Sequence, residues 1–298
     1  MEENFNSQDL TNPKDLINEL TNELAEQFLN SIEMLKKITL LTEKFYDGSH
    51  SKFVEAKSAL IAEELGIKDE SLTELKIAAA LHDIGKVSFN DTLLYKNVTE
   101  MESNELVIYQ KHPEIGYYIL KTNPHLNEVA KIVLQHHERN DGSGFPNNLN
   151  SDRIHPAAKI ISVVNIYHNA IYKKRITANQ GKTQLNYINI STFLENTKER
   201  FNNVLNYLYN KRGSQFEKKV VELLIDIETE ERRQMGDKTV LRLPVNRLEP
   251  GMQVADDYFT SYGMLIAARG DILTEDSIRA MMRFVENEEL PMKILVIS

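Results

Sequence analysis

Residues 129–146 read VAKIVLQHHERNDGSGFP, and residues 75–86 read LKIAAALHDIGK. In each stretch, apolar residues at helical spacing lead into a His-His or a His-Asp pair, and glycine follows soon after. Glycine commonly ends helices, so each stretch is typical of a buried helix that closes in a polar turn. Almost nothing before residue 235 has the alternating pattern of a strand. The sequence therefore predicts a mainly α fold.

The first helix is predicted from Asn12, a suitable N-cap, and from Pro13, which favours a first turn. Its apolar residues recur with a period of about 3.6, at Leu16, Leu20, Leu24, Phe28, Ile32 and Leu35. We expect this apolar stripe to pack on the rest of the chain. The alternative is a helix that dimerises or transmits a signal.

Further helices are marked by residues with turn and capping preferences. Gly66 is expected to end a helix over residues 51–65. The pairs Ser71/Glu74 and Thr99/Glu102 have the spacing of capping boxes and predict two helix starts. Helical patterns continue over residues 125–138, 159–172, 190–209 and 215–231.

The composition changes after residue 235. Residues 231–238, ERRQMGDK, are typical of a linker, and short apolar runs separated by Gly, Pro and Asp follow them. A hairpin turn is predicted at 261–263, a short helix over 274–286 and a final strand in MKILVI. We therefore expect an N-terminal helical segment (1–45), a main domain (46–235) and a small mixed α/β module (240–298).

Composition excludes several classes of protein. Asp and Glu outnumber Lys and Arg by 44 to 35, so binding to long nucleic acid is not expected. The absence of cysteine excludes disulfides, iron–sulfur clusters and thiolate zinc sites. The start, MEENFNSQDL, lacks the features of a signal peptide, and no apolar run reaches the roughly 18 residues of a membrane span. We expect a soluble, cytoplasmic protein.

The His-Asp and His-His pairs have the chemistry of a metal site. Imidazole and carboxylate are ligands that borderline divalent cations prefer, and the two oxygens of Asp83 could bridge two ions. Lys86 could neutralise an anion beside them. Such dipeptides also recur by chance. The residues alone therefore leave open both a metal site that handles a phosphate ester and a purely structural cluster.

Longer motifs around these pairs resemble a known family. Residues 82–86 (HDIGK) resemble the HD-x-G-K motif of HD-superfamily metal phosphohydrolases, and residues 136–146 are similar to the HHE-x-x-DG-x-G-Y-P signature of their HD-GYP branch. Other matching stretches are HPEIG (112–116), KIIS (159–162), GSQF (213–216) and, in the C-terminal module, LPVNRLEPGMQVADD. The resemblance implies an HD-type helical bundle with a small mixed α/β C-terminal module. It also implies a cyclic di-GMP phosphodiesterase with two divalent metal ions, most suitably iron or manganese.

Carried over position by position, the resemblance implies a set of site residues. The metal ligands would be His50, His82, Asp83, His112, His136, His137 and Asn165. Asp83, as the bridging ligand, and Lys86, against the substrate phosphate, would carry the catalysis, with two cations about 3.5–4 Å apart acidifying a water. Phe145 and Arg175 would also contact substrate, while Glu138 and Asp141 would orient ligands or loop backbone. His125, His155 and His168 are left as surface or structural residues.

Four departures from the family pattern concern the metals and the substrate. Asn165 stands where the family has an aspartate, so one metal should bind more weakly or be missing, and Phe145 replaces the tyrosine of GYP. Arg175 keeps the first position of an R-P-Y-R motif, but the next three residues are Ile176, Thr177 and Ala178. Tyr46 stands where some members have a glutamate, so a third metal is not expected.

Three functions remain open at this point. The first is a phosphodiesterase that hydrolyses cyclic di-GMP through a binuclear metal centre. The second is a weak or inactive relative that serves as a metal-containing cyclic-dinucleotide receptor or protein-interaction module, and the third is a hydrolase of another phosphorylated nucleotide. The resemblance also allows a GGDEF-type protein partner and a homodimer.

Overall fold

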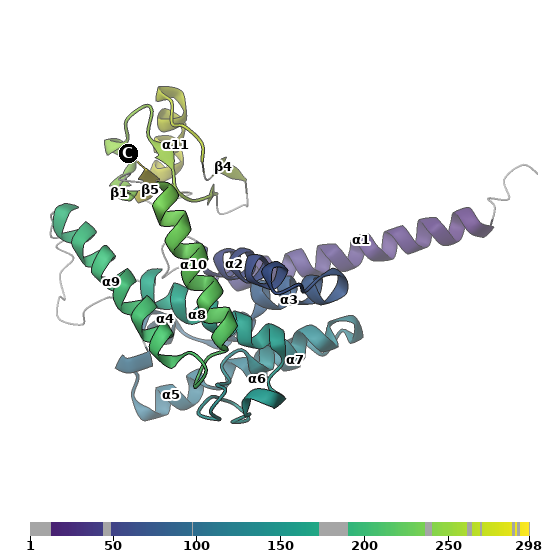
Figure 1. The fold of residues 1–298 in the computed structure, drawn as a ribbon. Coiled ribbons are helices and arrows are strands. Elements are labelled where there is room, and N and C mark those ends of the chain that lie inside the picture. Colours follow the sequence, from purple (N-terminus) through teal and green to yellow (C-terminus); the bar gives the residue numbers. More distant parts are fainter. Residues whose placement is uncertain are drawn as a thin grey trace, which may run out of the picture.

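The computed structural model describes residues 13–43, 49–96, 98–172, 190–235, 240–260, 264–268, 270–287, 290 and 293–297. Over these residues the chain is mainly helical, with a few short strands near the C-terminus, as predicted (Figure 1). The helices pack around one apolar core, and the strands enclose a second, smaller core. Among the described residues, no helix is both long and apolar enough to cross a membrane.

The main core is built by helices from distant parts of the chain. The helices are α1 (Pro13–Leu40), α2 (His50–Glu64), α3 (Asp69–Leu81), α4 (Asp91–Tyr95), α5 (Ser103–Tyr109), α6 (His112–Leu120), α7 (Asn127–Gln135), α8 (Pro156–Tyr172), α9 (Ile190–Lys211) and α10 (Lys218–Met235), and a 3₁₀ turn, η1 (Ile84–Ser88), follows α3. Short 3₁₀ turns lie at Val98–Glu100, Pro124–Leu126 and Ser151–Arg153. Helix α8 contacts α2, α3, α7, α9 and α10, so it forms the centre of the bundle.

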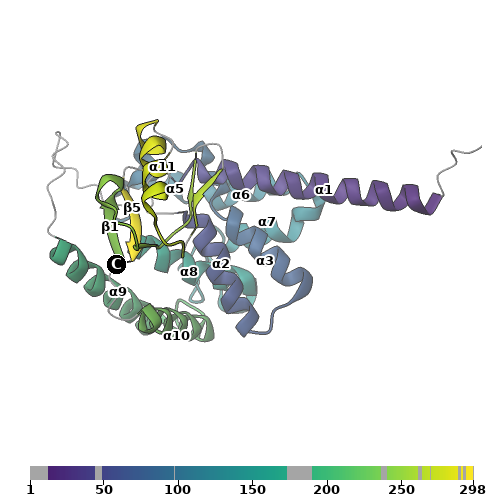
Figure 2. The same cartoon turned by 90° about the horizontal axis from the view of Figure 1, so that it is seen from above.

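Helix α1 packs on the bundle only at its C-terminal end. Ile32 is buried, whereas Leu16, Leu20 and Leu24 are 46%, 50% and 67% exposed. Both views show the helix extending beyond the bundle (Figures 1 and 2). The expectation that the whole apolar stripe packs on the chain is therefore wrong for its N-terminal half, because no other described helix reaches that far.

Three predicted boundaries are also corrected. Helix α3 begins at Asp69, before the expected cap at Ser71, and Lys68 at its N-cap makes no side-chain capping bond. The capping box of α5 is formed by Glu102 and Glu105 rather than by Thr99 and Glu102. Helix α10 continues to Met235, through the first five of the eight residues of the predicted linker. Local capping signals locate a helix end only to within a few residues.

A buried ion pair joins three helices of the bundle. Lys57 Nζ on α2 lies 3.0 Å from Glu228 Oε1 on α10, and the hydroxyl of Tyr167 on α8 donates to Glu228 Oε2 at 2.5 Å. All three side chains are buried. Breaking such a pair by removing one partner leaves an uncompensated buried charge, which typically costs about 3–5 kcal/mol. This contact therefore fixes α8 against α2.

The C-terminal module is a small α/β unit. Strand β5 (Lys293–Ile297) pairs antiparallel with β1 (Val240–Pro244) and β2 (Gln253–Val254), so the sheet order is β1-β5-β2. Strands β3 (Tyr258–Phe259) and β4 (Leu265–Ala267) form a separate antiparallel pair, and α11 (Glu275–Glu286) begins at the N-cap Thr274. A 3₁₀ turn lies at Val245–Arg247. The module touches the bundle where Lys52 Nζ lies 3.4 Å from the centre of the Phe259 ring.

Candidate metal centre

The candidate ligands sit at the ends of four helices, where the chain turns and side chains from different helices can converge. His82 and His136 are the C-cap residues of α3 and α7, and Asp83 follows His82 directly. His50 and His112 are the first residues of α2 and α6. All five side chains are buried.

Asp83 stands between two groups of histidines. Its Oδ2 lies 3.5 Å from His82 Nε2 and 3.6 Å from His50 Nε2. Its Oδ1 lies 3.4 Å from His112 Nε2 and 3.9 Å from His136 Nε2. We call His50, His82 and Asp83 the first subsite, and Asp83, His112, His136 and His137 the second subsite. In each, one ligand atom per residue lies within 4.8 Å of the others.

The nitrogen and oxygen atoms of the cluster are better arranged to coordinate metal ions than to form hydrogen bonds with one another. Asp83 Oδ1 and His137 Nε2 are buried and make no hydrogen bond, although an unsatisfied buried polar group costs about 1–3 kcal/mol. Two pairs of ring nitrogens also face each other, His50 Nε2 with His82 Nε2 at 3.1 Å and His112 Nε2 with His136 Nε2 at 3.3 Å. Imidazole nitrogens around a carboxylate suit divalent transition metals.

Protonation favours metal binding as well. Burial lowers the pKa of His50, His82, His112, His136 and His137, so that all five rings are held in the neutral form that a metal requires. Burial alone would raise the pKa of Asp83. The positive charge of Lys86 opposes this effect and holds that pKa well below its usual range, so Asp83 is ionised.

Three of the histidines are oriented by backbone carbonyls. Their Nδ1 atoms lie 2.6–2.7 Å from the carbonyl oxygen three residues earlier, in the pairs His82–Ala79, His112–Tyr109 and His136–Val133. An N–H donated from Nδ1 leaves the Nε2 lone pair directed at Asp83. This is the common arrangement behind a metal-ligating histidine.

Glycines let the ligand-bearing segments approach closely. A Cβ on Gly85 would lie 2.0 Å from His112 O and 2.8 Å from Gly116 N, so η1 contacts α6 through backbone. A Cβ on Gly144 would lie 2.4 Å from Glu138 Cα. These contacts bring the chain after Asp83 against His112, and the loop after α7 back against the histidine pair.

The loop after His137 is held by the carboxylates predicted to support it. Glu138 accepts hydrogen bonds from the backbone N–H groups of Asn147 (2.7 Å) and Leu149 (2.9 Å). Asp141 is exposed and accepts from the backbone N–H and hydroxyl of Ser143. The Phe145 ring stacks on His137, with centroids 4.6 Å apart. The loop thus covers one side of the second subsite.

The remaining predicted site residues are placed in different ways. Lys86 is buried, and its Nζ lies 2.5 Å from Asp83 Oδ2. Asn165 is buried on α8, where its amide oxygen accepts from Asn169 Nδ2. Arg175 and Tyr46 lie outside the described residues. The structure brings the histidines, Asp83 and Lys86 together, whereas the roles of Asn165 and Arg175 stay predictions.

Two buried residues near the site were given no part in it by the sequence analysis. His168, predicted to be a surface or structural residue, is buried: its Nδ1 lies 2.9 Å from His50 Nδ1, and burial, with His82 nearby, lowers its pKa to about 3. Glu43, just after α1, accepts from the Ser51 backbone N–H, and burial raises its pKa to about 7. Only His168 had a local signal, because it follows Asn165 by one helical turn.

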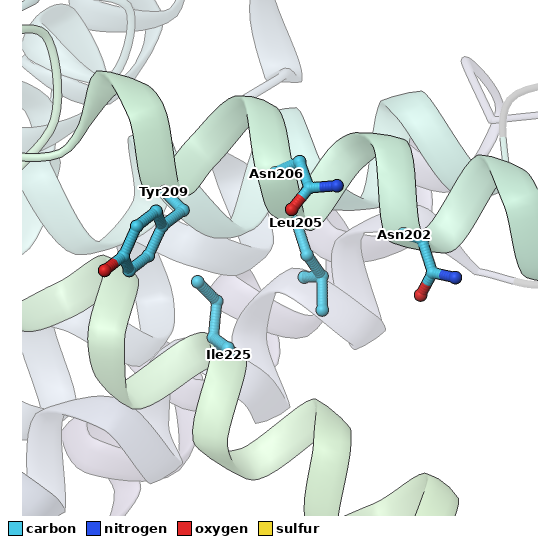
Figure 3. Close-up of a pocket in the computed structure, with 5 residues that line it drawn as sticks. All are labelled: Asn202, Leu205, Asn206, Tyr209 and Ile225. Carbon is cyan, nitrogen blue, oxygen red and sulfur yellow. The ribbon is translucent and has the colours of Figure 1, made fainter.

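Space beside the cluster is small. A cavity of about 10 Å³ adjoins Asp83 and Lys86, and its other walls are Thr42, Phe89, Leu93, Leu94 and Tyr109. A larger pocket of about 340 Å³ lies between α9 and α10 and is lined by Asn202, Leu205, Asn206, Tyr209 and Ile225 (Figure 3). Of those five residues, only Tyr209 carries a group that can act as an acid or a base, and none is a histidine or a carboxylate. The chemistry is therefore concentrated around Asp83.

Comparison with known proteins identifies a family and several relatives of this chain. Residues 14–189 match the family model described as HD domain. The chain is 31% identical over 215 residues to the cyclic di-GMP phosphodiesterase response regulator RpfG of Xanthomonas campestris, which covers 68% of this chain and 49% of that protein. It is 34% identical over 157 residues to a cyclic di-GMP phosphodiesterase of Thermotoga maritima, covering 50% of this chain and 42% of that protein.

A third relative is the 3′3′-cGAMP-specific phosphodiesterase 2 of Vibrio cholerae, 30% identical over 212 residues, with 70% of this chain and 35% of that protein covered. The chain thus spans about half or less of the length of these curated relatives. Among solved structures, the HDG"Y"P protein Bd1817 of Bdellovibrio bacteriovorus superposes with a TM-score of 0.47 at 22% identity, over 60% of this chain and 51% of that one.

Proposed function

The chain belongs to the HD domain family, and from that premise we propose that it is a metal-dependent phosphodiesterase of the HD-GYP type that hydrolyses cyclic di-GMP or a related cyclic dinucleotide. The observation that carries the proposal is the position of Asp83. One ionised, buried carboxylate directs one oxygen at each of two groups of neutral histidines. A carboxylate in that position can hold two cations at once.

The proposed ligands are the five histidines and Asp83, with Asn165 as a further neutral ligand. When bound, two divalent cations would lower the pKa of a water and neutralise charge on a phosphate diester. The chain's own residues hold the centre: the loop after α7 shields His137, and backbone carbonyls fix the rings of His82, His112 and His136. Lys86 provides a buried positive charge beside Asp83, where it would face a phosphate oxygen.

Iron or manganese is the proposed occupant, because every ligand atom is a nitrogen or an oxygen and no thiolate is available in the sequence. We also propose that residues 46–235 carry the catalytic domain and that Phe145 and Arg175 contact the substrate. A GGDEF-type partner and a homodimer stay predictions of the resemblance.

The proposal is tested by measuring metal content and turnover in the same sample. The protein is purified anaerobically, analysed for iron, manganese, zinc and nickel, and incubated with cyclic di-GMP and 3′3′-cGAMP while linear products are followed by chromatography. We expect about two metals per chain and a linear dinucleotide or mononucleotide product. Metal binding without product from either substrate would contradict the proposed activity.

A second candidate is a metal-containing receptor that binds the nucleotide without turnover. It is favoured by Asn165, which brings no charge where the family pattern has an aspartate, so two dications would face a single carboxylate. Calorimetric titration with cyclic di-GMP distinguishes the two. Saturable binding with unchanged nucleotide recovered afterwards would support the receptor.

A further inference from the structure

We propose that His168 is a positioning residue for the first subsite: it accepts a hydrogen bond from His50 and so directs the other nitrogen of His50 at the metal. The inference rests on the proposed metal centre and concerns a residue that the metal-ligand pattern does not include. Its basis is one contact, the 2.9 Å distance between His50 Nδ1 and His168 Nδ1 across 118 residues of sequence.

The position of His50 in its helix explains why it needs such a partner. The carbonyls that orient His82, His112 and His136 belong to Ala79, Tyr109 and Val133, each in the last turn of a helix. Carbonyl groups at a helix C-terminus have no partner within the helix and are free to accept. His50 instead begins α2, where the unpaired backbone groups are N–H donors, and the carbonyl of the preceding Ser49 already accepts from Phe53.

The protons in this contact can be counted. Two Nδ1 atoms at 2.9 Å share one hydrogen, so one ring donates and the other accepts. If His50 Nε2 is to ligate a metal, its lone pair must be free and its proton must sit on Nδ1. His168 must then be neutral, with its own proton on Nε2 and its Nδ1 lone pair turned to His50.

The surroundings hold His168 in place. It is buried on α8, and its ring lies 4.5 Å from that of Phe53, one turn along α2 from His50. The neighbouring Tyr167 is bonded to Glu228, which pairs with Lys57 of α2. These contacts hold α2 and α8 together beside the His50–His168 pair, so a rotation of His168 away from His50 would disturb its packing on Phe53.

The test compares His168→Phe, which keeps an aromatic ring but removes the acceptor, with His168→Asn, whose amide oxygen can occupy the place of Nδ1. Metal content and affinity are measured by titration with a competing chelator on the full chain, without substrate. In His168→Phe we expect one of the two metals to bind about 10–100-fold more weakly, the usual effect of removing the partner behind a metal-bound histidine. His168→Asn should bind within about threefold of the native protein, a difference under about 0.7 kcal/mol.

A double-mutant comparison separates positioning from packing. If His168 acts through His50, adding His168→Phe to His50→Ala should weaken metal binding no further than His50→Ala alone, whereas independent effects would add. His155→Phe, at a histidine that pairs with Glu128 away from the cluster, is the matched control and should keep both metals.

Three results would overturn the inference: native metal affinity in His168→Phe, equal loss in the Phe and Asn variants, or additive losses in the double variant. If His168→Phe does not fold, the Asn variant decides, because a loss as large as that of His50→Ala would contradict an acceptor role. Absence of turnover with normal metal content would contradict the proposed function alone. A native protein that binds no metal after reconstitution would overturn both.

Discussion

The two subsites share Asp83 but are assembled in different ways. In the second subsite, His112 and His136 are oriented by carbonyls of their own chain segments, and the glycine-rich loop that covers His137 begins directly after it. In the first subsite, His50 depends on His168, which is supplied by a helix more than 100 residues away. Local backbone therefore defines the second subsite, whereas packing of α2 on α8 defines half of the first.

This difference predicts that mutations will affect the two subsites to different extents. A change in the packing of α8 should loosen the first subsite and leave the second intact. Changes at Asp83, or at the glycine contact that holds it, should affect both. The four predictions below test that division, beginning with the largest effect.

Asp83→Ala should remove both metals, because it deletes the only carboxylate that both subsites share. We expect metal content to fall from roughly two per chain to none, with loss of any turnover, as measured by elemental analysis after gel filtration. The exposed Asp152→Ala serves as control. Retention of even one metal would show that a single subsite can assemble without Asp83.

Gly85→Ala should destabilise the domain by about 3 kcal/mol or more, since the new Cβ would lie 2.0 Å from His112 O and would force η1 away from α6. Chemical denaturation of the metal-free protein measures the change. Gly66→Ala is the matched control: it has φ +80 but nothing within 4 Å, so it should lose only about 1 kcal/mol. If Gly85→Ala and Gly66→Ala lower the free energy of unfolding equally, η1 can move away from α6 without loss of stability.

Glu43→Gln tests the contact between the end of α1 and the start of α2. Burial raises the pKa of Glu43 from 4.5 to about 7, so the folded state holds this proton more tightly than the unfolded state. Stability from this group is complete at low pH and is lost as pH rises through about 7. Between pH 5 and 8, the free energy of unfolding of the native protein should fall by up to about 3 kcal/mol relative to that of Glu43→Gln. Chemical denaturation with a chelator present measures both proteins. If the free energy of unfolding changes with pH in the same way in both proteins, Glu43 does not have a raised pKa in the folded state.

Asn165→Asp should add a negative charge at the ligand position that the resemblance assigns to α8. We expect one metal to bind about tenfold more tightly, equivalent to about 1.4 kcal/mol, with the other unchanged. Competition with a chelator measures both constants. If neither constant moves, Asn165 does not face a metal, and the predicted last ligand position is wrong.

The sequence predicts the helices because helical periodicity is a local signal, and the His-Asp and His-His pairs mark His82, Asp83 and His136 as ligand candidates. The expectation that His50 and His112 join them comes from the family resemblance and not from a local pattern. The contact of His168 with His50 had no such signal, since it depends on how α8 crosses α2. The protonation of Glu43 likewise follows from burial, which one chain segment cannot reveal.

The 10 Å³ cavity beside Asp83 and Lys86 is about the size of a single water. The other walls of this space are formed by Thr42, Phe89, Leu93, Leu94 and Tyr109. Thr42 lies just after α1, and Leu93 and Leu94 lie on α4, so the wall joins two separate parts of the chain. A nucleotide phosphate that approached Lys86 from this side would have to part α4 from the end of α1, and the observed association rate would then level off as the nucleotide concentration rises.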